Sequence, residues 1–265
     1  MPKIKVNDIH LNYESYGKGY PLIMILGIQA DIGWWGRSLL QKISEKFKVI
    51  VYDNRGTGGS DNSNKDFDMI DLIHDAKGLM DALEIKQAHI FGHSMGGLIA
   101  SGLTINYSKK VSKLVLCSSS CGESKLIPAP PDVIDILNKP KDNLSPEKIA
   151  KDSLSIFYTP EFLKTHPKLI ELAIKNMTKA QISSKSYKLQ LRAISNYDIC
   201  DKLKLIKNPT CIMHGLRDRL VLHENGKILA KLIPEAKLIL FENSAHVPFV
   251  EEREKFIETL LEFLK

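Results

Sequence analysis

A serine between glycines marks the place where this chain's residue types suit nucleophilic chemistry. Residues 90–97 read IFGHSMGG, so Ser94 follows an apolar strand predicted over 88–91 and precedes a predicted helix of small residues. In that context Gly-x-Ser-x-Gly is typical of a nucleophile elbow, a strained turn that projects the serine hydroxyl from the sheet edge. Gly92 and Gly96 fit because a Cβ at either position would collide with neighbouring backbone. The motif predicts a nucleophilic Ser94, with an ordinary glycine-rich turn as the alternative.

Asp218 and His246 are the candidates for the acid and the base that an activated serine requires. The base must reach the hydroxyl, and the acid must fix the tautomer of the base and stabilise its imidazolium form. Asp218 follows a strand predicted over 211–214, and His246 follows one predicted over 238–241. An open α/β sheet places its site on such loops, at the carboxyl ends of strands. The expected triad is therefore Ser94, Asp218 and His246.

Strands and helices alternate in the first half of the chain. The expected strands are 9–16, 22–26, 49–52, 88–91 and 114–117, and the expected helices are 36–46, 66–83 and 95–107. Strand–helix order returns near the end, as 210–214, 223–232, 236–241 and 251–264. This βαβ alternation predicts a mostly parallel, doubly wound sheet.

The segment from Pro131 to about Ile206 has helical patterns and no convincing buried strand. Prolines bar regular helix near its start and divide the remainder into short helices. The prolines that bar helix are Pro128, Pro130 and Pro131, and those that divide the remainder are Pro140, Pro146, Pro160 and Pro167. We therefore expect a helical insertion between two parts of one sheet.

Four segments together resemble the α/β-hydrolase superfamily, in its small, cap-bearing, serine-esterase-like branch. They are the elbow 92–97, the turn 53–60 (DNRGTGGS), the segment 214–218 (HGLRD) and the pair at 245–246 before a terminal helix. The resemblance covers essentially the whole chain. It implies an α/β-hydrolase fold with an eight-stranded, mostly parallel sheet and a helical cap inserted after the sixth strand. The implied core is 1–121 with 207–265, and the implied cap, or lid, is 122–206.

The resemblance also implies roles for individual residues. Ser94 would be the nucleophile, His246 the base and Asp218 the acid. The oxyanion hole would use the backbone N–H of Met95, at a helix N-terminus, and that of Ile28.

One position departs from the family pattern. The usual His-Gly pair reads Leu26-Gly27 here, and the missing histidine normally braces the loop that carries Ile28.

Other polar residues near these motifs have structural interpretations. Asp53 and Arg55 suggest an acid/base pair, but in this family the turn that carries them is structural. His93 and His214 flank the working residues and are expected to be structural. For substrate contacts we expect Gln29, Trp35, Phe157 and Val247, with Trp34 as a second pocket residue or a core residue.

The charge, the apolar stretches and the cysteines of the chain limit the partners and locations to be expected. The net charge of +6 comes from scattered lysines without an arginine-rich block, which argues against nucleic acid. The first residues lack a signal-peptide core, and no stretch reaches the roughly 18 apolar residues of a membrane span. We therefore expect a cytoplasmic monomer or homodimer that binds neither membrane nor metal nor organic cofactor. The cysteines (Cys117, Cys121, Cys200, Cys211) lack CxxC spacing, so free thiols are expected.

The expected reaction is hydrolysis of a small carboxylic ester through an acyl-enzyme. Serine rather than aspartate at position 94 argues against the dehalogenase and epoxide-hydrolase branches of the fold. The same triad also supports C–C bond hydrolysis, lactone opening, acyl transfer and perhydrolysis. A hydrolase-fold protein that senses a ligand and regulates a partner is the alternative from a different class.

Overall fold

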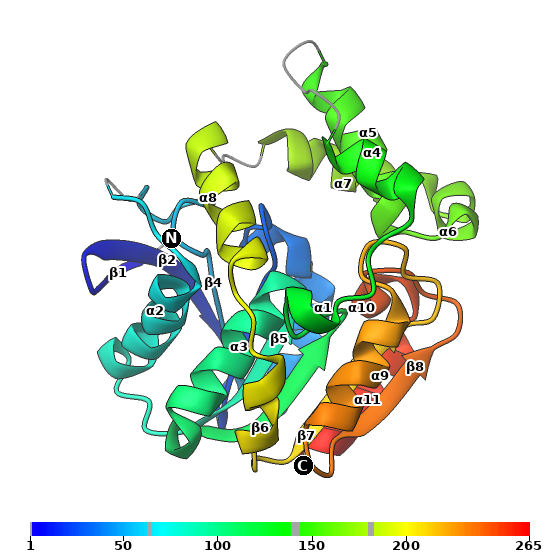
Figure 1. Ribbon diagram of the computed structural model, residues 1–265. Helices are drawn as coiled ribbons and strands as arrows, with labels where there is room; N and C mark the ends of the chain where they lie inside the picture. The colour runs from blue at the N-terminus through cyan, green and yellow to red at the C-terminus, as the bar shows by residue number, and fades with distance from the viewer. Residues whose placement is uncertain (1, 63–64, 139–143, 180–182) are drawn as a thin grey trace.

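A single mostly parallel sheet organises the protein. The computed structural model describes residues 2–62, 65–138, 144–179 and 183–265. Within them the sheet has eight strands in the order β1-β2-β4-β3-β5-β6-β7-β8 (Figure 1). They are β1 (Lys3–Val6), β2 (Ile9–Tyr16), β3 (Pro21–Ile25), β4 (Lys48–Tyr52), β5 (Ala88–His93), β6 (Val111–Cys117), β7 (Thr210–Gly215) and β8 (Lys237–Phe241). β2 pairs antiparallel with β1 and β4, and all later pairs are parallel, which confirms the predicted fold class.

Helices cover both faces of the sheet. α2 (Met69–Ala82), α3 (Met95–Asn106) and α9 (His223–Leu232) contribute to one apolar core, and α1 (Arg37–Ser44) and α11 (Arg253–Leu264) contribute to the other. Successive β3 residues alternate between the cores, with Ile23 in the first and Met24 in the second. Because parallel strands are buried on both faces, they are apolar throughout, as the sequence of β3 is. Among the described residues no helix is long and apolar enough to cross a membrane.

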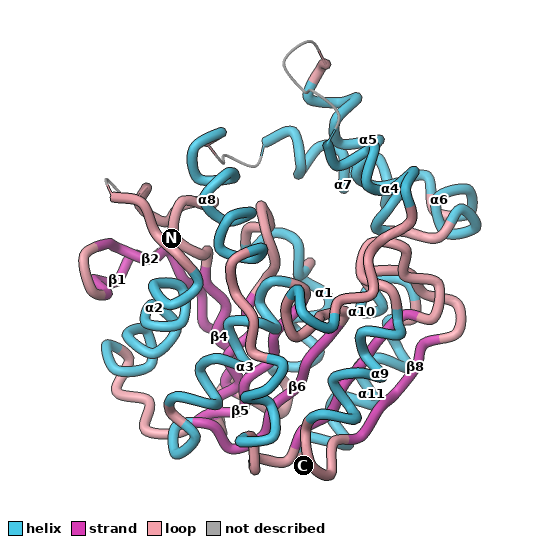
Figure 2. Tube along the Cα trace, viewed as in Figure 1, coloured by secondary structure: helices cyan, strands magenta, loops and turns pink. Residues whose placement is uncertain are grey.

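Between β6 and β7 the described residues form five α-helices (Figure 2). They are α4 (Pro131–Asn138), α5 (Pro146–Phe157), α6 (Pro160–Thr165), α7 (Pro167–Lys179) and α8 (Ser184–Ser195). α5, α6 and α7 each start at a proline that was expected to divide helices, a position where the missing N–H costs nothing. α4 starts at Pro131, which was instead expected to bar regular helix. Pro140 lies outside the described residues. α5 packs against α4 and α7, and α7 also packs against α6, whereas α8 packs against α2. We call residues 122–206 the cap segment.

Two elements differ from the sequence expectation. The residue patterns alone do not predict β1, because its four residues alternate exposed lysines with Ile4 and Val6 over only a short run; the resemblance implies an eighth strand without locating it. The helix expected over 251–264 is two helices, α10 (Pro248–Glu251) and α11, because Glu252 has non-helical dihedral angles (φ −119°, ψ 51°). Short 3-10 turns complete the fold: η1 (Ile32–Trp35), η2 (Ser108–Lys110), η3 (Glu123–Lys125) and η4 (Cys200–Leu205).

The expectation of four free thiols is wrong for two of the cysteines. Cys121 and Cys200 form a disulfide across a sequence separation of 79 residues, while Cys117 and Cys211 are free and buried. Sequence spacing gave no sign of the pair, because the fold alone brings the two ends of the cap segment together. There the Ile199 N–H also donates to the Cys121 carbonyl, at 2.9 Å. Because disulfides persist mainly in oxidising compartments, this bond gives no support to the expected cytoplasmic location.

Reduction of this disulfide is expected to lower the free energy of unfolding by about 2–4 kcal/mol, because the bond restricts the unfolded chain. Urea unfolding with and without dithiothreitol measures the effect. The Cys121→Ser/Cys200→Ser variant should match the reduced wild type and should not respond to dithiothreitol. Equal midpoints for oxidised and reduced wild type would contradict the prediction.

Candidate active site

The turn at Ser94 has the strained geometry of a nucleophile elbow. Ser94 lies between β5 and α3 with φ 55° and ψ −122°, in a region that residues with a Cβ rarely adopt. Its N–H donates to the Cys117 carbonyl at the end of β6, at 2.9 Å. A Cβ on Gly92 would collide with the Gly96 carbonyl, and one on Gly96 would collide with the Ile25 carbonyl. Both glycines are therefore required for this turn, as the sequence predicts.

His246 and Asp218 form a buried pair on the loops after β8 and β7. His246 Nδ1 lies 2.8 Å from Asp218 Oδ2, and both side chains are almost completely buried. The other carboxylate oxygen, Oδ1, accepts the backbone N–H groups of Leu220 and Val221 at 2.9 and 3.0 Å. The carboxylate is thus fixed by its own loop and presents Oδ2 to the imidazole.

The surroundings keep Asp218 ionised. Burial alone would raise its pKa, but the charge of His246 and the hydrogen bonds of His214 and His246 outweigh it and hold the pKa well below the ordinary value. His214 Nε2 lies 3.4 Å from Oδ2 and 2.7 Å from the Val221 carbonyl. A Cβ on Gly226 of α9 would come within 2.7 Å of His214 Nδ1, so that glycine provides room for the ring.

Two aromatic rings flank His246. Phe157, the last residue of α5, stacks on the imidazole with ring centroids 5.7 Å apart, and its carbonyl accepts the His246 N–H at 3.0 Å. His93 Nε2 lies 2.9 Å from the His246 carbonyl. Burial lowers the pKa of His93 to about 3, so the ring is neutral and donates its Nε2 proton to that carbonyl. His93 and Phe157 thereby orient the histidine without sharing its side-chain hydrogen bonds.

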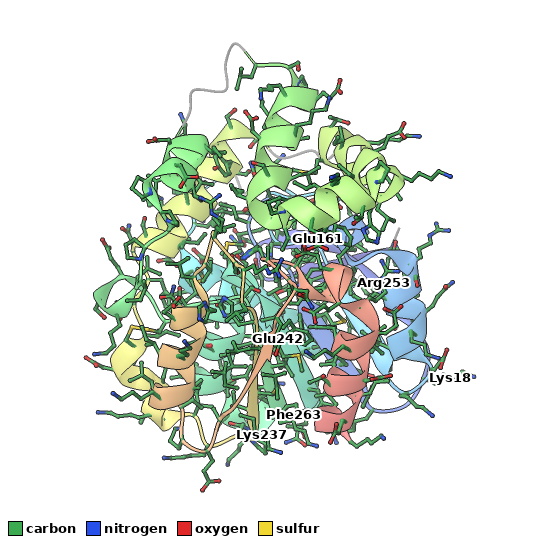
Figure 3. The ribbon with its side chains drawn as sticks, turned by 90° about the vertical axis from the view of Figure 1, so that its right-hand side faces the viewer. Lys18, Glu161, Lys237, Glu242, Arg253 and Phe263 are labelled. Atoms are coloured by element: carbon green, nitrogen blue, oxygen red, sulfur yellow. A yellow bond between two sulfur atoms is a disulfide. The ribbon has the colours of Figure 1, made fainter. Side chains whose placement is uncertain are left out.

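Ser94, Asp218 and His246 lie on loops at the same end of the sheet, the end that faces the cap segment. In the view turned by 90°, β8 rises from Lys237 toward Glu242, with Glu161 of α6 above them (Figure 3). The hydrogen bonds of the described residues do not include one between Ser94 Oγ and His246. Such contacts are often longer when no substrate is bound.

The loop after β3 runs directly past Ser94. A Cβ on Gly27 would lie 2.9 Å from Ser94 Cβ and 3.3 Å from its Oγ, so glycine is needed for this approach. The next backbone N–H along the loop is that of Ile28, and the next after Ser94 is that of Met95. Neither N–H is a donor in the hydrogen bonds recorded for the described residues. Both are therefore available to a bound group.

The turn at residues 53–60 holds this loop in place through side-chain hydrogen bonds. Asp53 Oδ1 accepts the Ile32 N–H at 2.7 Å, and Asn54 Nδ2 donates to the Leu26 carbonyl at 3.0 Å. Arg55 forms a buried ion pair with Asp75 of α2, at 2.6 Å, rather than with Asp53. These contacts agree with the structural role expected for the turn.

The expected substrate contacts divide into two groups. Phe157 lies beside the triad, stacked on His246, and Gln29 is part of the loop after β3. Val247 and Trp35 are buried in the core, where Trp35 packs between Phe91 and Phe249.

Trp34 is the second pocket residue that the sequence suggests. It is half-buried, and its ring meets that of Phe157 edge-on at 5.5 Å. The adjacent tryptophans could not be distinguished from sequence, because the 3-10 turn η1 decides which of them faces the core.

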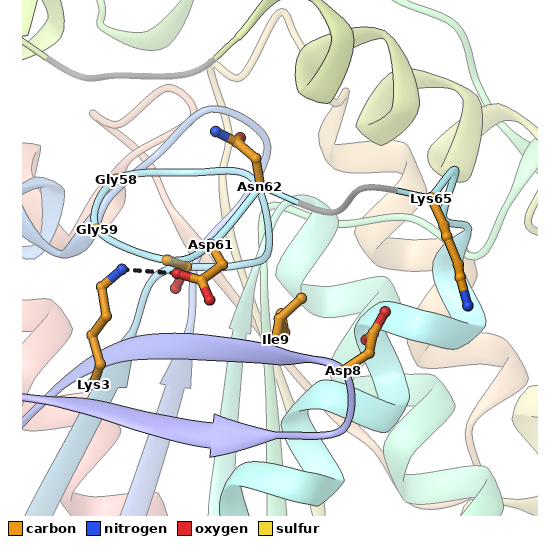
Figure 4. A pocket seen from close by; sticks show the side chains of 9 residues that line it. Lys3, Asp8, Ile9, Gly58, Gly59, Asp61, Asn62 and Lys65 are labelled. Carbon is orange, nitrogen blue, oxygen red and sulfur yellow. Dashed lines mark hydrogen bonds and ion pairs between the residues drawn. The ribbon is translucent and has the colours of Figure 1, made fainter.

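A cavity of about 620 Å³ lies between the β1–β2 hairpin and residues 58–62 (Figure 4). Its charged lining residues are Lys3, Asp8, Asp61 and Lys65. Lys3 and Asp61 form an ion pair across it, at 2.9 Å. This mixed-charge cavity is separate from the loops that carry Ser94, Asp218 and His246.

Comparison with known proteins agrees with this architecture. The chain belongs to the α/β-hydrolase fold family, whose model matches residues 20–253. It is 26% identical to 3-oxoadipate enol-lactonase 2 of Acinetobacter baylyi, over 96% of this chain and 92% of the relative. It is 30% identical to 2-hydroxy-6-oxo-6-phenylhexa-2,4-dienoate hydrolase of Burkholderia cepacia, over 97% and 91%. The solved esterase of Exiguobacterium antarcticum superposes with a TM-score of 0.84 at 27% identity, over 98% of each chain. The protein is thus a hydrolase, and its relatives differ in the bond that they cleave.

Proposed function

We propose that this protein is a serine hydrolase that cleaves a small carboxylic ester through an acyl-enzyme. The observation that carries the proposal is the buried His246–Asp218 pair, at 2.8 Å, on loops at the same sheet edge as the strained Ser94. An ionised acid held by two backbone N–H groups, an imidazole bonded to it and a serine on a sharp turn are the parts of a nucleophilic triad.

In the first half of the reaction His246 Nε2 removes the hydroxyl proton as Ser94 Oγ attacks the ester carbonyl. Asp218 holds the proton on Nδ1, so that Nε2 is free to accept, and stabilises the imidazolium that forms. The imidazolium then protonates the leaving alcohol. In the second half a water molecule gives its proton to His246 and attacks the acyl carbonyl. The bond between the acyl group and Ser94 Oγ then breaks, the imidazolium returns its proton to Oγ, and the acid leaves.

The oxyanion formed in each half is proposed to bind the backbone N–H groups of Ile28 and Met95. Both follow a residue at the point of closest approach between the β3 loop and the elbow, Gly27 and Ser94 respectively. Met95 is also the first residue of α3, where the helix dipole favours negative charge. Removing one such donor costs about 10²–10³ in kcat in enzymes of this chemistry.

The substrate side of the site is proposed to include Phe157, Trp34 and the segment at Gln29, with the cap segment as a lid over the core at 1–121 and 207–265. The ring of Phe157 stacks on His246, and Trp34 meets Phe157, so an acyl or aryl group above the triad would meet apolar walls. This favours a small, fairly apolar substrate.

Lactone opening or C–C bond hydrolysis is the second candidate. It is favoured by the enol-lactonase and the dienoate hydrolase to which the chain is similar along nearly its whole length. Lactone opening is ester cleavage within a ring, so the same acyl-enzyme scheme applies to it.

The test combines turnover with trapping of the covalent intermediate. The protein is assayed with p-nitrophenyl acetate and butyrate, an enol lactone and a 2-hydroxy-6-oxo-dienoate. It is also treated with a fluorophosphonate and digested for mass spectrometry. We expect one adduct, on the peptide that contains Ser94, and fastest turnover of the short p-nitrophenyl esters. Faster turnover of the lactone or the dienoate would favour the second candidate, and the absence of both adduct and turnover would overturn the proposal.

A further inference from the structure

The loop after β3, residues 26–32, is held by side chains at three points. Asn54 holds the Leu26 carbonyl at its start, and Asp53 holds the Ile32 N–H at its end. In its middle the N–H of Gln29 donates to Gln190 Oε1, at 3.1 Å. The first two residues belong to the core turn at 53–60. The third belongs to α8, so the cap segment supplies the central contact.

Gln190 is placed to hold the loop firmly. Its side chain is completely buried, and its amide group bonds at both ends. While Oε1 accepts from Gln29, Nε2 donates to Thr57 Oγ1 at 2.9 Å and to the Arg55 carbonyl at 3.3 Å. The amide therefore bridges the loop to the same core turn that holds the loop's two ends. With three hydrogen bonds its orientation is fixed, because the reverse orientation would point the amide N–H₂ at the Gln29 N–H.

This contact determines which N–H of the loop is left for a ligand. Gln29 has φ 62°, a left-handed conformation that is unfavourable for a residue with a Cβ and persists where surrounding contacts enforce it. Gln190 Oε1 accepts the hydrogen bond of the Gln29 N–H, whereas the neighbouring Ile28 N–H has no acceptor among the described residues. The side chain of Leu26, at the start of the loop, packs in the apolar core and offers no hydrogen bond.

We infer that Gln190 is a positioning residue for the oxyanion hole: a cap-segment amide that fixes the Gln29 turn and so aims the Ile28 N–H at the substrate. The inference rests on the function proposed above. It gives the cap segment a second task besides covering the site, because α8 would hold part of the catalytic machinery in place.

Gln190→Met tests the inference, because methionine fills a similar volume without a hydrogen-bonding amide. We expect kcat for the best ester to fall about 10- to 100-fold, because the donor is misplaced rather than removed. KM should change less than about threefold, since the oxyanion forms after substrate binding. Affinity for phenylboronic acid, whose serine adduct is tetrahedral, should fall with kcat.

Ser186→Ala is the matched control. Ser186 is also a buried residue of α8, one turn before Gln190, and its Oγ donates to Asn62 Oδ1 of the core at 3.1 Å. It makes the same kind of cap-to-core contact without touching the β3 loop. We expect its kcat and its boronate affinity to stay within about twofold of the wild type.

Thr57→Val provides a second route if Gln190→Met fails to fold. It removes the hydroxyl that holds Nε2, and it should lower kcat and boronate affinity together, about three- to tenfold. The inference is overturned if a folded Gln190→Met or Thr57→Val protein behaves like Ser186→Ala, or if KM alone changes. Failure of the proposed function would show differently, as wild-type protein that neither turns over esters nor forms the fluorophosphonate adduct.

Discussion

Replacing Ser94 with alanine is expected to lower kcat for short p-nitrophenyl esters by about 10⁴- to 10⁶-fold. The variant cannot form the acyl-enzyme, and only binding and the oxyanion donors remain to speed attack by water. His246→Ala should lose a similar factor, because a serine hydroxyl without a base is a poor nucleophile. The double variant should be no slower than either single variant, since the two residues act as one unit.

Steady-state assays with active-site titration measure these effects, and thermal melting shows that each variant is folded. Ser101→Ala is a suitable control. Ser101 is buried in α3, the helix that follows Ser94, and within the described chain its Oγ has no hydrogen-bond partner. It should retain wild-type activity within about twofold. An effect at Ser94 below about 100-fold would place the nucleophile elsewhere.

Replacing Asp218 with asparagine is expected to lower kcat by about 10⁴-fold at neutral pH while leaving the fold intact. The structure gives a specific reason. The N–H groups of Leu220 and Val221 require an acceptor at the Oδ1 position, so the asparagine oxygen would take that place. Its NH₂ group would then face His246 Nδ1, which becomes an acceptor. The imidazole proton then resides on Nε2, so Nε2 can no longer accept the proton of Ser94.

The same variant should flatten the dependence of stability on pH in acid. The pKa of Asp218 is lower in the folded protein than its ordinary value of about 3.9. Its contribution to stability is therefore fully present above that value and is lost as pH falls toward the folded pKa. Urea unfolding at pH 7, 5 and 3 should show the wild type losing more stability than Asp218→Asn below pH 5. Parallel curves would contradict this account.

The fold and the triad candidates could be predicted because each rests on a local pattern. The elbow glycines around Ser94 and the apolar strands before Asp218 and His246 are visible in a few consecutive residues. Because strands and helices alternate, the loops that carry Ser94, Asp218 and His246 follow parallel strands and therefore lie at one edge of the sheet.

What could not be predicted depends on contacts between distant segments. The Cys121–Cys200 bond spans 79 residues, and Gln190 reaches Gln29 across 161. No spacing rule connects such positions, since a glutamine on a helix ordinarily faces solvent. Trp34 and Trp35 were ambiguous for a different reason: neighbouring residues exchange roles when a helical turn rotates by one position.

The disulfide also changes the topology of the chain. Between Cys121 and Cys200 the backbone and the sulfur bridge form a closed covalent ring that contains α4, α5, α6, α7 and α8. A single cut of the backbone within this ring leaves both fragments attached, so the cap segment can be opened without being released. New chain termini placed inside it would likewise stay joined through sulfur. The ring can therefore tolerate changes of length and sequence away from α8 and Phe157 while its two ends stay fixed on the core.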